Sequence, residues 1–179
     1  MSEVIIGTSA HESADTALLR QAHIGWIRQG FGMPFADKVG GALSERYVKS
    51  KEQAQRWIAQ GFKIMGVSHG IGIGTYVPDG AGGLKLQWKS SVPEWYGEPG
   101  SDRFIRTYRD VCAFLAADLR ELVPLWQIAN EFDIPQFFGP LDMAQAAKVL
   151  EEGARGLKQG NPHAIVGPNM GGILRGYYL

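Results

Sequence analysis

The stretch LWQIANE, residues 125–131, decides the fold prediction because a short apolar strand runs directly into polar residues. Short apolar runs bounded by polar or turn residues are typical of buried strands. Bulky Trp126 and Ile128 alternate with Gln127 and Ala129, so a strand over 125–130 would present bulky side chains to one face and small or polar ones to the other. If Glu131 continues this alternation, it lies on the same face as Gln127 and Ala129. We therefore predict a buried strand that delivers a glutamate at its carboxyl end.

Working outward, similar apolar runs alternate with segments of helical periodicity, which favours a parallel α/β sheet. Capping-box patterns at Ser50/Gln53 and Asp142/Gln145 predict two helix starts. Residues 70–100 are polar and glycine-rich and are predicted to form a long loop, whereas 171–179 show no pattern. We expect one domain over 1–179, with five strands at 4–8, 24–28, 62–67, 125–130 and 164–167 and helices at 15–22, 51–60, 104–122 and 142–160.

Composition excludes several classes of partner and cofactor. Lys+Arg and Asp+Glu both total 18, so the net charge is zero and no basic surface for nucleic acid is expected. No apolar run reaches the ~20 residues of a membrane span, and the acidic start Met1-Ser2-Glu3 is unlike a signal peptide. We therefore expect a cytoplasmic chain, with a secreted parent left open. Residues 70–74 lack the GxGxxG spacing and no His/Cys cluster has metal-ligand spacing, so we expect no cofactor and no metal.

Several motifs, taken in order, resemble one enzyme clan. They are a first strand with Ile6-Gly7 and His11, the run from Leu18-Leu19 to Ile27-Arg28, the third strand Gly61–Gly66, the fourth-strand signature from Trp126 to Asn130-Glu131, and the fifth strand Val166–Met170. Together they resemble the retaining glycoside hydrolases of clan A, which include cellulase-like and β-xylosidase-like enzymes. The resemblance implies a (β/α) TIM-barrel fold and an oligosaccharide, polysaccharide or other glycoside as substrate.

The resemblance also assigns roles to residues of the fourth and second strands. It implies that Glu131 is the catalytic acid/base, that Asn130 binds the hydroxyl at the sugar's second carbon, and that Arg28 holds the charge of the nucleophile. Barrel active sites form at the carboxyl ends of strands. Polar residues at or just beyond those ends are therefore candidate substrate-binding residues, namely Arg28, His69, His11 and Asn169. Aromatic rings stack on sugars, so Trp88 and Trp95 in the 70–100 segment are candidates too.

The same resemblance predicts an incomplete barrel. A complete barrel has eight strands and about 250 residues, whereas this sequence supplies about five βα units. The clan's nucleophile is a glutamate at the end of the seventh strand, and no residue here matches it. We therefore expect the N-terminal part of a larger enzyme that is inactive alone, whose open sheet edges favour self-association.

Other interpretations remain at this stage. Glu131 would then cap a loop or pair with a surface cation, and the aromatic rings would only pin the loop to the barrel. Two other functions fit the same residues: a non-catalytic carbohydrate-binding half-barrel, or a different TIM-barrel enzyme in which Glu131 abstracts a proton.

Overall fold

The computed structural model describes residues 6–11 and 13–171. Within them, the main sheet has the strand order β1-β2-β3-β6-β7, and every neighbouring pair is parallel. Its strands are β1 (Gly7–Thr8), β2 (Trp26–Gly30), β3 (Lys63–Val67), β6 (Leu125–Ile128) and β7 (Ile165–Pro168). Chain order equals strand order, as in a (β/α) barrel that runs through five of its eight units. The five predicted strands and their parallel arrangement are confirmed, although residues 4 and 5 of the first lie outside the described residues.

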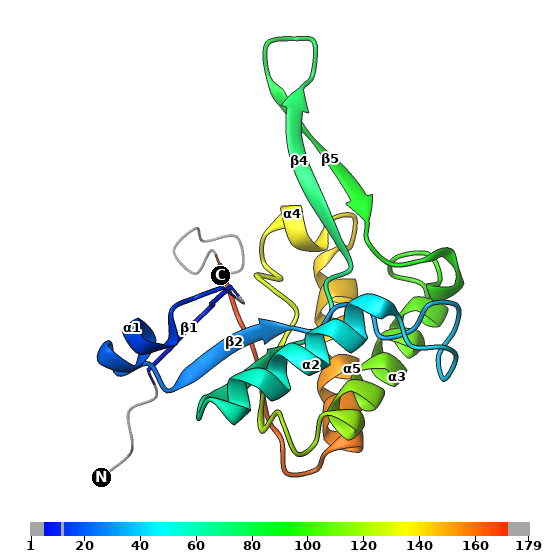
Figure 1. Ribbon diagram of the computed structural model, residues 1–179. Coiled ribbons are helices and arrows are strands. Elements are labelled where there is room, and N and C mark those ends of the chain that lie inside the picture. Colours follow the sequence, from blue (N-terminus) through cyan, green and yellow to red (C-terminus); the bar gives the residue numbers. More distant parts are fainter. Residues whose placement is uncertain (1–5, 12, 172–179) are drawn as a thin grey trace.

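Helices connect successive strands of this sheet. They are α1 (Thr16–Gln21), α2 (Glu45–Ala59), α3 (Asp102–Asp118) and α5 (Met143–Gly160), with a short α4 (Pro135–Phe138) before α5. Figure 1 shows α2, α3 and α5 gathered together, with α1 and β1 at the far end of the sheet. The capping box of Asp142 and Gln145 is confirmed at the start of α5.

The predicted start of the second helix is wrong by six residues. The Ser44 side chain caps α2 by accepting from the Tyr47 amide, so the helix begins at Glu45. Ser50 lies inside the helix, where its hydroxyl donates to the Arg46 carbonyl oxygen at 2.9 Å. A serine within a helix can bond the preceding turn in this way and needs no cap.

Residues 70–100 are not the long loop that the glycines suggested. They contain the antiparallel hairpin of β4 (Gly72–Pro78) and β5 (Leu84–Ser90), followed by the single turn η1 (Glu94–Tyr96). At the hairpin tip, the Asp79 carboxylate accepts from the Ala81 and Gly83 amides at 2.8 and 2.9 Å. Figure 1 shows the tip of the hairpin projecting beyond the helices, whereas the lower part of β4 runs beside α4. Gly72 and Gly74 therefore lie within β4, and Gly80, Gly82 and Gly83 form the turn at the hairpin tip.

The main sheet is buried on one face and open on the other. Ile27, Ile64, Trp126 and Ile128 belong to the core beneath the helices. The predicted placement of Trp126 and Ile128 on one face of the strand is confirmed, and that face packs beneath the helices. The opposite face lines a cavity of about 340 Å³ with Trp26, Arg28, Met65 and Leu125 among its walls, and Ile165 is 67% exposed. That open face corresponds to the interior of a barrel.

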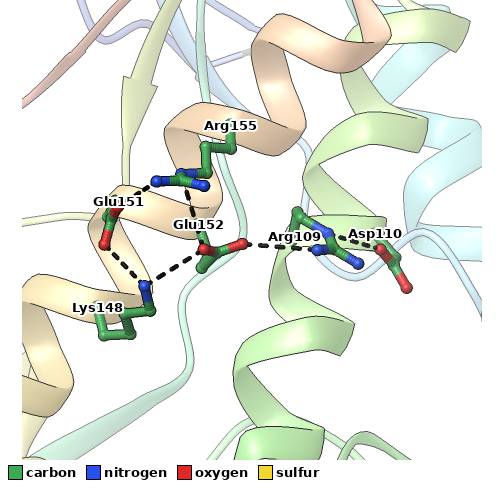
Figure 2. Close-up of polar contacts among 6 residues, drawn as sticks. All are labelled: Arg109, Asp110, Lys148, Glu151, Glu152 and Arg155. Atoms are coloured by element: carbon green, nitrogen blue, oxygen red, sulfur yellow. Dashed lines mark hydrogen bonds and ion pairs between the residues drawn. The ribbon is translucent and has the colours of Figure 1, made fainter.

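Helices α3 and α5 pack with their backbones almost in contact. A Cβ at Gly156 would lie 2.2 Å from the Arg109 carbonyl oxygen, and one at Gly160 would lie 2.1 Å from that of Ala113. Glycine permits this approach because it has no side chain. At the edge of this contact, Glu152 lies 3.7 Å from Arg109 of α3, within the ion-pair network of Arg109, Asp110, Lys148, Glu151, Glu152 and Arg155 (Figure 2).

Candidate active site

Polar side chains from β2, β6 and the end of β7 form one hydrogen-bonded cluster, which we call the strand-end cluster. Its members are Arg28, Gln127, Asn130 and Asn169. Arg28 donates through Nε to Gln127 Oε1 and through Nη2 to Asn130 Oδ1, both at 2.8 Å. Gln127 Nε2 donates to Asn169 Oδ1 at 3.0 Å and to the Ala129 carbonyl oxygen at 2.6 Å. The structure therefore brings together three of the predicted site residues, with Gln127 between them.

One predicted position within this cluster differs from the structure. Arg28 was expected at the end of its strand, but β2 continues to Gly30 because Gln29 and Gly30 pair with Gly66 and Val67 of β3. Arg28 thus lies inside the strand and points to the open face of the sheet, where it lines the cavity. This position lets it reach across to β6.

The backbone turns sharply at Glu131. Strand β6 ends at Ile128, two residues earlier than predicted, because Ala129 has φ 54° and Glu131 has φ 45°. Left-handed backbone in a non-glycine residue costs roughly 1–2 kcal/mol and persists only when neighbouring contacts enforce it. The strict alternation that placed Glu131 on the Gln127 face therefore does not extend to residue 131.

The carboxylate of Glu131 is left available by this turn. Its backbone amide donates to Asn169 Oδ1 at 2.7 Å, and its carbonyl oxygen accepts from Ile134 at 2.9 Å. Within the described part of the chain, the carboxylate itself has neither a hydrogen-bond partner nor an ion-pair partner. The side chain is half-buried beside Gly171. These contacts give no support to a cap or a surface ion pair as the role of Glu131.

Two residues of this region were missed in the sequence. Ser68 Oγ accepts from the Ala129 amide at 2.8 Å and bonds the hydroxyl of Tyr108 at 2.9 Å. Gln127 links Arg28 to Asn169. The only sequence signal for Gln127 was its polar character at an inward position of a buried strand, and for Ser68 its place directly after the third strand.

His69 occupies a buried site next to the strand-end cluster. Its Nε2 lies 2.6 Å from the Tyr96 hydroxyl, and its ring centroid lies 4.6 Å from that of Tyr108. The residue is 2% exposed, and burial lowers the pKa of its imidazole to about 3. It also lines a cavity of about 380 Å³ that includes Arg46 and Gly72. His69 is therefore a neutral group at ordinary pH.

Burial of neutral His69 predicts a stability that falls with acid. In the unfolded chain the imidazole takes up a proton near pH 6.5, whereas the folded protein holds it neutral down to about pH 3. The stability that comes from keeping His69 neutral is therefore fully present above about pH 6.5. Below that pH, this group lowers the free energy of unfolding by up to about 1.4 kcal/mol per pH unit. Urea unfolding of wild type and His69→Gln across this range measures the difference. Above pH 7 the two curves should differ by a constant offset, and parallel curves down to pH 4 would contradict the assignment.

The other predicted residues lie outside the hydrogen bonds of the strand-end cluster. His11 is exposed, bonds Ser13 Oγ at 2.8 Å and lines a separate groove of about 480 Å³ beside α2. The indole of Trp88 fills the space over Gly72, where a Cβ would lie 2.0 Å from the ring. Trp95 packs beside Tyr96 with ring centroids 5.7 Å apart. Both tryptophans are partly buried against the core.

Residues 6–11 and 13–171 hold no group of three or more His, Cys, Asp or Glu side chains placed to bind a metal ion. Over the same residues, none of the helices combines the length and the apolar character that crossing a bilayer requires.

The sequence matches no protein-family model and no curated protein. Solved structures, however, share its fold. A glucosidase from Croceicoccus marinus covers 93% of this chain at 13% identity with a TM-score of 0.56. An exo-β-1,4-mannosidase from Opitutaceae bacterium strain TAV5 covers 83% at 13% identity, with a TM-score of 0.55. A β-glucosidase from Exiguobacterium marinum covers 85% at 14% identity, also with a TM-score of 0.55.

This chain corresponds to only 37%, 26% and 35% of those three structures, respectively. Such coverage agrees with a sheet of five parallel strands where a complete barrel has eight. The chain therefore has the fold of part of a (β/α)-barrel of the kind found in glycosidases.

Proposed function

We propose that this chain is the N-terminal part of a retaining glycoside hydrolase in which Glu131 is the acid/base. One observation carries the proposal: Glu131 follows the fourth parallel strand on a strained turn, with an unpaired carboxylate beside the strand-end cluster. Strained backbone at a non-glycine residue is common at active sites. The carboxyl end of barrel strands is also where such sites form.

Asn130 and Arg28, which act beside Glu131 in the proposed mechanism, both keep hydrogen-bond donors that the described part of the chain does not use. Asn130 uses Oδ1 to accept from Arg28, so its Nδ2 is left to donate to a sugar hydroxyl. Arg28 uses Nε and Nη2, which leaves the donors of Nη1 for a carboxylate. These unused donors support the roles proposed for Asn130 and Arg28, namely sugar binding and support of the nucleophile.

The reaction requires a second carboxylate, to which we assign no residue of this chain. In a retaining glycosidase, the acid protonates the leaving oxygen while a carboxylate about 5–5.5 Å away attacks the anomeric carbon. The same acid then acts as a base on water. We propose that a further segment of the whole enzyme supplies the nucleophile, and that the chain alone is inactive.

The names of the structural neighbours suggest the substrate class. Two are glucosidases and one is an exo-β-1,4-mannosidase. We therefore propose a β-linked hexoside as substrate, recognised at the carboxyl ends of the strands beside the strand-end cluster.

The stereochemistry of the product tests this function. The full-length protein that contains this chain should hydrolyse at least one member of a panel of nitrophenyl β-hexosides with net retention, whereas residues 1–179 alone should not. Proton NMR during the first minutes of reaction distinguishes the two anomers. An inverted product would contradict the retaining mechanism. Absence of hydrolysis across the panel, from protein shown to be folded, would contradict the enzyme class.

A further inference from the structure

The turn that carries Glu131 contains two left-handed residues separated by one. Ala129 and Glu131 have φ angles of 54° and 45°, and Asn130 lies between them. Neither residue is glycine, so local preference alone would not produce this turn. Contacts from outside the three-residue turn must therefore hold it in place.

The backbone amide of each left-handed residue donates a hydrogen bond to a side chain. The two accepting side chains follow two different strands, one on each side of β6. The Ala129 amide donates to Ser68 Oγ, just beyond β3, at 2.8 Å. The Glu131 amide donates to Asn169 Oδ1, just beyond β7, at 2.7 Å. Strands β3 and β7 are the two neighbours of β6 in the sheet, so the turn is held from both sides.

Both acceptors are themselves held in place. Ser68 is 4% exposed, and its hydroxyl also bonds the Tyr108 hydroxyl of α3 at 2.9 Å. The carbonyl oxygen of the Asn169 side chain also accepts from Gln127 Nε2 at 3.0 Å. Gln127 in turn bonds Arg28 and the Ala129 carbonyl oxygen. The two acceptors are therefore fixed parts of the scaffold, as the support of a catalytic group requires.

We propose that Ser68 and Asn169 are positioning residues that fix the 129–131 turn and thereby direct the carboxylate of Glu131. The proposal rests on the proposed function for its catalytic consequence, whereas the clamp itself is a property of the fold. Neither side chain has to touch substrate. Their effect passes through the backbone amides of residues 129 and 131.

Hydrogen exchange tests the clamp directly. In the full-length protein, Asn169→Leu removes the acceptor for Glu131 and should accelerate exchange of that amide about ten-fold, and Ser68→Ala should do the same for Ala129. Asn169→Asp keeps an acceptor oxygen and should restore protection. Ser50→Ala, on the outer helix α2, is the control and should change neither amide. Residue-level mass spectrometry measures the exchange, and thermal unfolding verifies that each variant is folded.

The catalytic consequence is measured with two leaving groups. Loss of positioning should lower kcat for cellobiose at least ten-fold with KM little changed. It should scarcely change kcat/KM for dinitrophenyl β-glucoside, which reports the first step, because that leaving group needs no acid. Folded variants in which both amides stay protected would overturn the clamp. Faster exchange with equal losses of kcat/KM on both substrates would overturn the positioning role. If Glu131→Gln itself shows no dependence on the leaving group, the proposed function fails, while the exchange result still decides the clamp.

Discussion

Replacing Glu131 with alanine in the full-length protein is expected to separate substrates by their leaving group. Hydrolysis of cellobiose should fall by about 10²–10⁴-fold, the usual contribution of a positioned general acid. The departing sugar alkoxide is a strong base, so the bond does not break without a proton. A dinitrophenolate leaves without one, so the first step with dinitrophenyl β-glucoside should proceed at nearly the wild-type rate.

The second step of the same variant gives an independent readout. Without a base to activate water, the glycosyl-enzyme should accumulate and produce a burst of dinitrophenolate. Azide, which needs no base, should restore turnover and give a glycosyl azide. Glu45→Ala, an exposed glutamate at the start of α2, is the control and should behave as wild type. Wild-type rates of cellobiose hydrolysis by Glu131→Ala would rule out the acid/base assignment.

Adding a single methyl group at Gly156 or Gly160 is expected to destabilise the fold by about 1–3 kcal/mol or more. In a free helix, glycine to alanine is worth about 1 kcal/mol in the opposite direction. Here the new Cβ would lie 2.2 Å or 2.1 Å from a carbonyl oxygen of α3. Backbone atoms cannot rotate away as a side chain can, so α3 and α5 would have to separate and lose core contacts along their length.

Urea unfolding measures whether glycine to alanine lowers the stability here instead of raising it as in a free helix. Gly156→Ala and Gly160→Ala should lower the unfolding midpoint with little change in the m-value. The exposed Ala147 on the same helix provides the control. Ala147→Gly should cost about 1 kcal/mol by propensity alone. If both glycine variants are as stable as wild type, the close approach of the two helices in the structure is wrong.

The sequence predicted those strands and helix starts that a single short pattern of residues determines. The apolar run ending at Ile128 and the Asp142/Gln145 capping box each carry their own evidence, and both features are present in the structure. Ser50 matched the same capping pattern but lies inside α2, because Ser44 six residues earlier supplies the actual cap. A capping motif alone does not show which of two serines begins the helix.

The site depended on contacts that no local pattern encodes. The left-handed φ of Ala129 could not be predicted, since alanine ordinarily avoids that region and is held there by Ser68, 61 residues earlier in the chain. The link from Arg28 to Asn130 spans 102 residues. The resemblance to a known clan assigned roles to Arg28, Asn130 and Glu131, and the end of the fifth strand made Asn169 a candidate; the structure places these four residues near one another. The resemblance did not reveal Gln127 and Ser68, whose importance lies in holding the others.

The β4–β5 hairpin has a consequence for how this molecule can diversify. Its tip from Asp79 to Gly83 is exposed and closed by its own hydrogen bonds. Its base adjoins the cavity lined by His69 and Gly72. Because the tip lies at the far end of the hairpin from that cavity (Figure 1), insertions or deletions there can change its length without disturbing the cavity or the register of the parallel sheet. The chain thus separates a tip that tolerates change from a strand-end cluster whose side chains are joined by hydrogen bonds running from β2 through β6 to the segment after β7.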